Sequence, residues 1–486
     1  MVTAIQSEKI NTQLYINGEW VNSQSGERTD VINPATEEVV GSIPLAEKED
    51  LDRAVDAAQA AMDGEWSSLS GLDRGKALLR LADAIDAHRD EIVKAQVIEM
   101  GKPISLSTYE ITATADLFRY HAGWASKLSG SVRETTSDML TFVVREPVGV
   151  VAAITPFNVP IYLMATKLAV ALAAGCTFIH KPASATPLSA NAFATAVHDA
   201  NLPAGVYNLL TGSGSKLGEA ISTHPGIAKV AFTGSTKVGI GIIKNSADTV
   251  KHVTMELGGK SPNIVLADAD IEVAATNALV GNFMNSGQVC TSGSRLIVER
   301  PIYQAVVERL IKKLKECPIG NPMDEKTFFG PVASKSAYDK ILGYIKKGQE
   351  EGAKIATGGK PTQIDGKGYY IEPTVFVDAT NDMTIAREEI FGPVLTVIPV
   401  NDIDEAIRVA NDSPYGLASA VQTQDMKKAH QVAKALKAGT VWINTEFQWH
   451  HNAPYGGYKM SGMGRESGLA AYDAYLQSKT IWMAVK

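Results

Sequence analysis

The chain has 486 residues, of which 45% are hydrophobic and 20% charged, a composition typical of a globular protein with a large core. Its 46 Lys and Arg residues against 53 Asp and Glu residues give a net charge of −7, which argues against nucleic acid as a partner, because phosphate backbones attract clustered positive charge. A length near 500 residues predicts two or three domains.

The chain contains three cysteines, Cys176, Cys290 and Cys317, and no CxxC spacing. This set assembles neither a disulfide framework nor a structural zinc site, so no metal is predicted. A reducing cytoplasm suits such cysteines best. The first 20 residues lack the apolar core of a signal peptide.

The first part of the chain predicts long helices over residues 47–62 and 72–100. Residues 148–166 carry no charge and are long enough to suggest a membrane span. Pro156, Asn158 and Pro160 interrupt this stretch, which favours a buried strand, a turn and a helix instead. No membrane association is therefore predicted.

From residue 148 onward, short apolar runs alternate with amphipathic segments, which is typical of an α/β fold. The predicted strands cover residues 148–154, 176–182, 206–212 and 229–235, and the helices 160–175, 186–201 and 216–224. Pro160 stands in the first turn of its helix and Gly175 at its end. Such units build a right-handed parallel sheet with loops at the carboxyl ends of its strands.

A second α/β series follows a boundary near residues 256–261, where Gly258 and Gly259 allow sharp turns. Its predicted strands cover 262–268, 294–300 and 394–400. One predicted helix begins near residue 271, and two others cover 303–316 and 402–412. Before the first series, residues 130–145 alternate polar and apolar side chains and suggest an extended arm. The C-terminal run 480–486 could pair with this arm, within one subunit or between two.

Three polar residues occupy positions where chemistry is possible. Cys290 lies in the small, polar run NSGQVCTSG, where a thiol could be accessible and nucleophilic or simply structural. Glu256 ends an apolar strand run and could be a general base or a paired carboxylate. Asn158 precedes a helix and could donate to an oxyanion or cap the helix. We expect Cys176 and Cys317 to be structural.

The run FTGSTKVG (232–239) is a glycine-containing turn from a strand to a helix, where a pyrophosphate could approach the helix N-terminus. It lacks the GxGxxG spacing and is weak as an isolated motif.

Taken together and in order, these motifs resemble the aldehyde dehydrogenase superfamily over nearly the whole chain. The matching segments are NGEW (17–20), NPAT (33–36), TPFNVP (155–160), HKPAS (180–184), FTGSTKVG (232–239), MELGGKSPNIV (255–265), NSGQVC (285–290), EEIFGPV (388–394), GTVWIN (439–444) and PYGGYKMSGMGRE (454–466).

The resemblance implies that Cys290 attacks an aldehyde to form a thiohemiacetal, that a hydride passes to a nicotinamide cofactor, and that the resulting thioester is hydrolysed. It implies an oxyanion hole formed by Asn158 with the backbone N–H of Cys290. It also implies that Glu256 activates the deacylating water.

The resemblance also implies a set of cofactor-binding residues: Thr155, Phe157, Lys181, Ser184, Gly234, Ser235, Gly239, Glu389 and Phe391. Lys181 is expected near the adenosine ribose, Gly234 and Ser235 at the pyrophosphate, and Glu389 and Phe391 at the nicotinamide and its ribose. Many NAD-preferring members have a glutamate where this chain has Ser184. The expected cofactor is NAD or NADP. Because serine, unlike glutamate, does not repel a 2′-phosphate, we expect NADP to be accepted and even preferred.

The expected substrate pocket comprises Val159, Tyr162, Thr166, Trp449 and Tyr455. Val159 and Thr166 replace aromatic residues of many relatives, which suggests a wider entrance for a medium to bulky or aromatic aldehyde. The aromatic cage for a quaternary ammonium is then incomplete. Adjacent histidines such as His450 and His451 are poorly placed to bind one metal.

The resemblance implies two Rossmann-type α/β domains and a small β arm for oligomerisation. The cofactor domain is expected over residues 1–129 and 148–255, the catalytic domain over 256–465, and the arm over 130–147 and 466–486. Strand pairing between subunits would give a homodimer or homotetramer. Two alternatives remain: a CoA-acylating member of the family, and a non-catalytic structural protein on the same scaffold.

Overall fold

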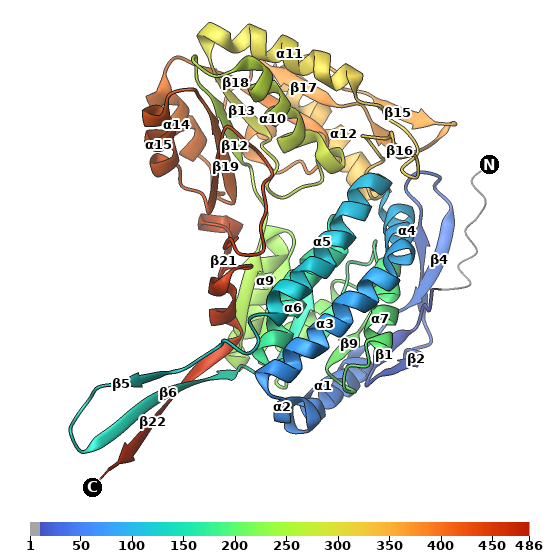
Figure 1. Ribbon diagram of the computed structural model, residues 1–486. Helices are drawn as coiled ribbons and strands as arrows, with labels where there is room; N and C mark the ends of the chain where they lie inside the picture. Colours follow the sequence, from blue (N-terminus) through green and yellow to red (C-terminus); the bar gives the residue numbers. More distant parts are fainter. Residues whose placement is uncertain (1–9, 486) are drawn as a thin grey trace.

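A computed structural model describes residues 10–485 as two α/β units, one above the other, with a β arm that projects from the lower unit (Figure 1). Residues 1–9 of the N-terminal segment, for which no signal peptide is predicted, lie outside the described residues. So does residue 486, the last of the predicted arm.

The lower unit is built on an eight-stranded sheet of order β2-β1-β9-β8-β7-β10-β11-β21. The five strands from β9 to β11 are parallel, while β1 and β21 join the two ends in antiparallel orientation. This confirms the predicted parallel sheet. The strands are β1 (Leu14–Ile16), β2 (Glu19–Val21), β7 (Val150–Ile154), β8 (Thr177–Lys181), β9 (Tyr207–Leu209), β10 (Lys229–Thr233), β11 (His252–Glu256) and β21 (Gly462–Met463).

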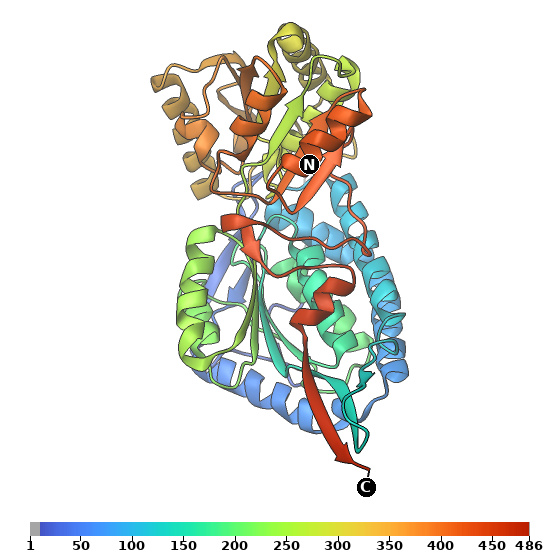
Figure 2. The same ribbon diagram turned by 90° about the vertical axis from the view of Figure 1, so that its left-hand side faces the viewer.

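Helices cover both faces of this sheet, which lies between two helical layers in Figure 2. One face packs against α1 (Lys48–Asp63), α8 (Lys216–Thr223) and α9 (Thr236–Ser246). The other packs against α3 (Gly71–Ala87), α4 (Arg89–Met100), α5 (Ile104–Ala122), α6 (Pro160–Ala174) and α7 (Leu188–Asp199), and the short α2 (Glu65–Ser68) follows α1. As predicted, α6 begins at Pro160 and ends before Gly175, which has φ +95°.

The predicted helix over residues 72–100 is instead two helices, α3 and α4. His88 separates them with φ −97° and ψ 9°. Its ring nitrogens contact the carboxylates of Asp199, at 2.7 Å, and Glu91, at 3.3 Å. These contacts favour the break, and no periodicity of apolar residues reveals them.

The upper unit is built on a seven-stranded sheet of order β14-β17-β18-β13-β12-β19-β20, in which only β14 is antiparallel to its neighbour. The strands are β12 (Pro262–Val265), β13 (Arg295–Glu299), β14 (Lys354–Thr357), β17 (Thr374–Val377), β18 (Val394–Val400), β19 (Ala418–Gln422) and β20 (Thr440–Ile443). Around them pack α10 (Ile271–Phe283), α11 (Tyr303–Glu316), α12 (Lys335–Glu350), α13 (Thr384–Arg387), α14 (Ile403–Asn411) and α15 (Met426–Ala435).

The predicted arm is a three-stranded antiparallel sheet of β5 (Ser131–Arg133), β6 (Met139–Pro147) and β22 (Leu476–Ala484). The C-terminal strand β22 pairs with β6 of the same chain, from Leu476 opposite Pro147 to Ala484 opposite Met139. The arm therefore forms within one subunit, and its outer strands β5 and β22 each keep an unpaired edge.

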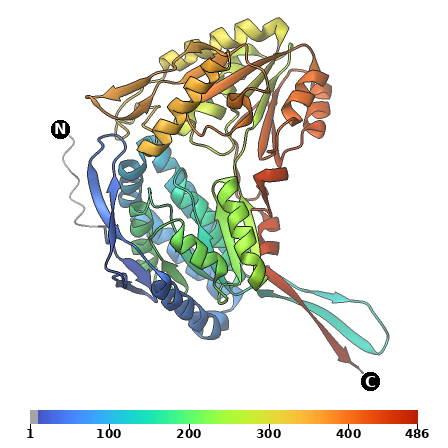
Figure 3. The same ribbon diagram turned by 180° about the vertical axis from the view of Figure 1, so that it is seen from behind.

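Two hairpins, β3 (Arg28–Ile32) with β4 (Val39–Pro44) and β15 (Pro361–Ile364) with β16 (Lys367–Ile371), lie side by side across the two units (Figure 3). The backbone N–H of Tyr369 donates to the carbonyl of Pro34 at 2.9 Å, and Lys367 pairs with Glu38 at 2.9 Å. Among residues 10–485, no helix has both the length and the apolar character that a membrane crossing requires.

Candidate active site

Cys290 follows a tight turn, η3 (Met284–Gly287), that begins the loop after α10. Asn285, Ser286 and Gly287 adopt φ values of +53°, +53° and +72° in succession. A Cβ atom at Gly287 would collide with the carbonyl of Gly392. Only glycine fits position 287 without displacing this carbonyl. The turn therefore depends on a residue without a side chain at that point.

Side chains of the same loop hold it in place. Ser286 donates to the carbonyl of Gly330 at 2.7 Å, and Oε1 of Gln288 accepts from the backbone N–H of Ala333 at 2.9 Å. On the other side, the carbonyl of Cys290 packs where a Cβ atom of Gly259 would stand. The loop that carries Cys290 is therefore held between segments of the upper unit.

The Cys290 thiol is half-buried, and its Sγ lies 3.5 Å from the hydroxyl oxygen of Tyr455. Burial raises the pKa of this thiol to about 12, and the nearby carboxylates Glu389 and Glu256 oppose its ionisation further. The thiol is thus neutral at neutral pH, and its use as a nucleophile requires a group that takes its proton.

Asn158 lies between β7 and α6 and is buried. Its Nδ2 donates one hydrogen bond, of 2.9 Å, to the carbonyl of Gln288, two residues before Cys290. Its own carbonyl accepts from Nδ2 of Asn285 at 3.1 Å. These hydrogen bonds join Asn158 to the loop that carries Cys290 and leave the second amide hydrogen of Asn158 without a partner among residues 10–485.

Glu256 ends β11 and is only 4% exposed, and its Oε2 has no hydrogen-bond partner within the described chain. Burial raises the pKa of this carboxyl group well above its usual range, and Glu466 raises it further. Lys167 and Arg465 act in the opposite direction. A carboxyl group with a raised pKa can exchange protons near neutral pH.

Lys167 is the only charged residue of α6, and it forms a buried ion pair with Glu466. Its Nζ also donates to the hydroxyl of Thr233 at 2.8 Å. Neither Lys167 nor Glu466 is among the residues predicted for the site. A single lysine in an otherwise apolar helix was a signal of the pair, since buried lysines require a partner.

The turn 232–239 connects β10 to α9 as predicted. Ser235 caps the helix, and its hydroxyl accepts from the backbone N–H of Val238 at 3.4 Å. Cβ atoms at Gly234 and Gly239 would lie 2.5 Å from the Phe232 ring and from Leu257. The two glycines let the helix pack closely, and the first N–H groups of α9 can bind an anion.

Lys181 ends β8 in a buried position, and its Nζ donates to the carbonyl of Pro182 at 3.0 Å. Burial lowers the pKa of this lysine to about 8. Ser184 is exposed, and its hydroxyl donates to the carbonyl of Gly212 at 3.0 Å. Thr155 is buried instead, and its hydroxyl lies 2.9 Å from His180.

Glu389 and Phe391 lie between α13 and β18. Oε1 of Glu389 accepts from the backbone N–H of Gly259 at 3.0 Å. The ring of Phe391 meets Phe157 edge to face at 5.7 Å, which brings two predicted residues of different units together. Lys340, which is not among the predicted site residues, donates to the backbone carbonyl of Glu389 at 3.3 Å.

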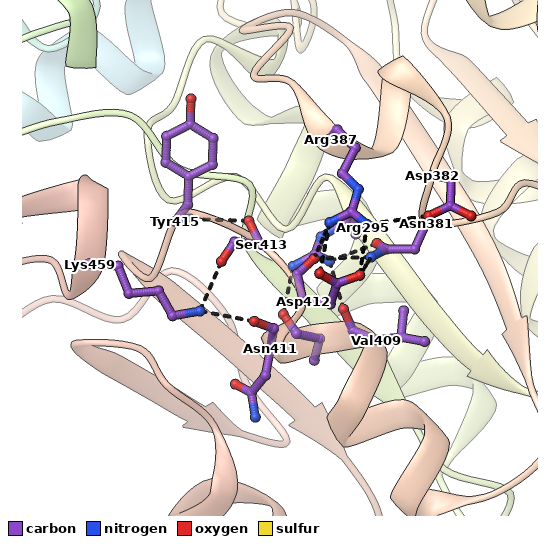
Figure 4. Close-up of polar contacts among 11 residues, drawn as sticks. Arg295, Asn381, Asp382, Arg387, Val409, Asn411, Asp412, Ser413, Tyr415 and Lys459 are labelled. Carbon is purple, nitrogen blue, oxygen red and sulfur yellow. Dashed lines mark hydrogen bonds and ion pairs between the residues drawn. The ribbon is translucent and has the colours of Figure 1, made fainter.

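A polar cluster around buried Arg295 fixes the segments that flank Glu389 and Tyr455 (Figure 4). Arg295 donates to the carbonyls of Val409 and Ala410 at 2.9 and 2.8 Å, and Arg387 pairs with Asp412 at 2.8 Å. Lys459 donates to the carbonyls of Asn411 and Ser413, each at 2.9 Å. Arg387 and Lys459 thereby hold both flanking segments against the loop after α14.

Aromatic side chains gather next to Cys290. Trp449 stacks on Tyr455 at 5.0 Å and meets Tyr162 edge to face at 6.0 Å. Val159 and Trp449 pack against the same core cluster. Thr166 is 3% exposed, and its hydroxyl donates to Glu466 at 3.0 Å.

The remaining histidines and cysteines show no metal-binding arrangement: the described part of the chain holds no group of three His, Cys, Asp or Glu side chains able to bind a metal. Cys176 is buried. Cys317 follows α11, and its thiol donates to the backbone carbonyl of Lys313 at 3.4 Å.

The site thus presents a thiol, an amide donor and a high-pKa carboxyl group side by side. A nicotinamide dinucleotide fits the adjacent groups, because α9 offers unpaired N–H groups to phosphates, Lys181 is a buried cation, and Glu389 offers a fixed carboxylate to ribose hydroxyls.

Comparisons with known proteins identify the family to which the chain is similar. Residues 20–481 match the profile of the aldehyde dehydrogenase family. The chain is 47% identical to aldehyde dehydrogenase 1 of Tanacetum cinerariifolium over 97% of this chain and 94% of the relative. It is similar to the NAD+ complex of an aldehyde dehydrogenase from Bacillus cereus, with 44% identity, a TM-score of 0.96, and coverage of 98% of this chain and 97% of that one. It is also similar to betaine aldehyde dehydrogenase from Staphylococcus aureus in complex with NAD+, with 40% identity, a TM-score of 0.97, and coverage of 99% and 96%.

Proposed function

Because the chain belongs to the aldehyde dehydrogenase family and is an NAD(P)-dependent enzyme that oxidises aldehydes, we propose that it does so through covalent catalysis by Cys290. The observation that supports this most strongly is the grouping of the Cys290 thiol, the Asn158 amide and the unpaired Glu256 carboxyl group in one partly closed site. Oε2 of Glu256 has no hydrogen-bond partner within the described chain, and Asn158 keeps one amide hydrogen beyond the bond that it donates to Gln288.

In the first half-reaction, the Cys290 thiol gives its proton to Glu256, and the sulfur forms a bond to the aldehyde carbon. The carbonyl oxygen takes the electron pair and accepts hydrogen bonds from Asn158 and from the backbone N–H of Cys290. The nicotinamide, when bound, supplies the hydride acceptor. The thiohemiacetal then becomes a thioester on Cys290.

Before the second half-reaction, Glu256 releases the thiol proton to solvent. It then takes a proton from a water molecule, whose oxygen adds to the thioester carbon. The bond between carbon and sulfur breaks, the sulfur leaves with the electron pair, and a carboxylic acid is released. A CoA-acylating enzyme would use a thiol in place of water. The buried, unpaired carboxyl group of Glu256 favours water.

For the cofactor, we propose that NADP is accepted and preferred over NAD. Lys181 supplies a cation at the end of β8, and the exposed Ser184 places no negative charge near it. A 2′-phosphate therefore meets attraction without repulsion.

For the substrate, we propose a medium to bulky aldehyde, including aromatic ones. The stacked pair of Trp449 and Tyr455 offers a flat apolar surface beside Cys290, and Val159, a small side chain, packs against the same core cluster as Trp449. Aromatic rings bind such a surface by offset stacking. The widening role expected of Thr166 stays a prediction.

We further propose that the lower unit binds the cofactor, that the upper unit supplies the nucleophile, and that the arm joins subunits into a dimer or tetramer. The unpaired edges of β5 and β22 are available for such pairing, and Trp482 on β22 is 60% exposed. A reducing, cytoplasmic setting suits a free nucleophilic thiol.

The test is the formation of reduced nicotinamide with aliphatic, aromatic, amino and carboxylated aldehydes, each with NAD and with NADP. We expect turnover that disappears in Cys290→Ala and is highest with aromatic aldehydes and NADP. Turnover that persists in Cys290→Ala would exclude the cysteine mechanism. Turnover that requires CoA would replace hydrolysis by acyl transfer.

A further inference from the structure

The Tyr455 hydroxyl is the one side chain of the described residues that forms a hydrogen bond with the Cys290 thiol, at 3.5 Å. Sulfur is large, so this separation is a normal hydrogen-bond length. The other ionisable groups that face the thiol are Glu256 and Glu389, and both disfavour a thiolate. Tyr455 is thus the neutral donor opposite two carboxyl groups.

The structure holds Tyr455 rigidly in this position. Its backbone exchanges two hydrogen bonds with Glu466, each of 2.7 Å, and its ring stacks on Trp449 with an angle of 23° between the planes. Burial raises the pKa of Tyr455 well above its usual range of about 10, and Cys290, Glu256 and Glu466 add to this effect. The phenol therefore keeps its proton and can donate a hydrogen bond.

We propose that Tyr455 is a catalytic residue whose hydroxyl donates a hydrogen bond to the Cys290 sulfur whenever that sulfur carries negative charge. This inference rests on the proposed function in treating Cys290 as the nucleophile. The charge arises twice: when the thiol loses its proton to Glu256, and when the bond between sulfur and the acyl carbon breaks and sulfur keeps the electron pair. The Tyr455 proton stays on its own oxygen in both steps.

In the intervening thiohemiacetal, the sulfur is neutral and the negative charge has moved to the oxygen near Asn158. In the thioester that follows, sulfur and oxygen are both neutral. The Tyr455 bond is therefore strongest at the beginning and at the end of the cycle. A donor with this timing lowers the barriers for attack and for release of the product acid.

The test measures alkylation of Cys290 by iodoacetamide as a function of pH, with the modified peptide quantified by mass spectrometry so that Cys176 and Cys317 do not contribute. In Tyr455→Phe, which keeps the aromatic ring, we expect alkylation below the pKa of the thiol to be about ten- to a hundredfold slower, the value of one hydrogen bond to a charged group. The matched control is Tyr120→Phe, which removes a hydroxyl that donates to Asn452 at 2.9 Å outside the site.

A second variant guards against a packing effect. Replacement of Tyr455 by a fluorinated tyrosine makes the phenol a stronger donor without changing the fold, and we expect faster alkylation, opposite in sign to Tyr455→Phe. Equal alkylation rates in all Tyr455 variants would overturn the proposal. Aldehyde oxidation by the wild-type protein, measured in parallel, reports on the proposed function separately, since alkylation requires neither aldehyde nor cofactor.

Discussion

Lys167 and Glu466 form an ion pair that is buried beside the carboxyl group of Glu256. Lys167 comes from the apolar helix α6, and Glu466 follows the strand that pairs with β11. The two charges act on Glu256 with opposite signs, because Glu466 raises its pKa and Lys167 lowers it. In the proposed mechanism, the pair sets the pH above which Glu256 can accept a proton.

Neutralising each member of the pair should therefore move the pH profile in opposite directions. Glu466→Gln removes the charge that raises the Glu256 pKa, so the acidic limb of the kcat profile should shift to lower pH by about one unit. Lys167→Met should shift it to higher pH, since Glu256 must then lose its proton beside an uncompensated carboxylate. Steady-state kcat measured between pH 5 and 9 shows in which direction each variant shifts the acidic limb.

A matched control lies on the arm, where Lys479 pairs with Glu146 at 2.5 Å in an exposed position. Glu146→Gln should leave the profile unchanged. Each buried variant should also lose about 3–5 kcal/mol of stability, because its partner charge remains buried. A shift of both buried variants in the same direction would contradict the assigned roles.

The second prediction concerns Asn158, whose side-chain amide donates one hydrogen bond to the carbonyl of Gln288 and presents one further hydrogen. Asn158→Ala should lower kcat about 10²- to 10³-fold, as expected for one oxyanion donor, with little change in cofactor affinity. Asn401→Ala, which removes an exposed amide bonded to Glu405 at 2.7 Å, serves as the control. Near-normal kcat in Asn158→Ala would restrict Asn158 to a structural role.

The elements and the site differ in how far sequence alone predicts them. Buried parallel strands such as β7 and β18 read as continuous apolar runs, and Pro160 and Gly175 mark the ends of α6 through backbone preferences that act locally. The short strands β1 and β2, each of three residues, carry too few side chains to show a pattern.

The site residues escape prediction where their partners are distant in the chain. Lys167 and Glu466 are 299 residues apart, and Cys290 and Tyr455 are 165 residues apart. Cys290, Glu256 and Asn158 were recognised through the resemblance of their motifs to a family. Their shared environment, including the high pKa of Glu256, depends on burial that only the folded chain provides.

The third prediction concerns Ser184. Ser184→Glu should lower kcat/KM for NADP about ten- to a hundredfold and change that for NAD much less, because a carboxylate repels the 2′-phosphate and accepts from ribose hydroxyls. Ser184→Ala keeps the position neutral, and its ratio of the two efficiencies should match the wild type. A Ser184→Glu ratio that stays at the wild-type value would place the 2′-phosphate elsewhere.

Gly287 offers a test of the loop that carries Cys290. Its φ of +72° and its approach to the carbonyl of Gly392 exclude a side chain, so Gly287→Ala must displace the turn that carries Cys290. We expect a loss of about 2–4 kcal/mol in the free energy of unfolding and at least a hundredfold loss of kcat, because a nucleophile displaced by a fraction of an ångström no longer meets its target.

The matched change is Gly343→Ala, in the exposed middle of α12, where a Cβ atom would meet nothing within 4 Å. Alanine suits a helix better than glycine, so this variant should gain about 0.5–1 kcal/mol and keep full activity. Thermal and urea unfolding followed by circular dichroism give both free energies. If Gly287→Ala matched Gly343→Ala in stability and in kcat, the turn would not be what positions Cys290.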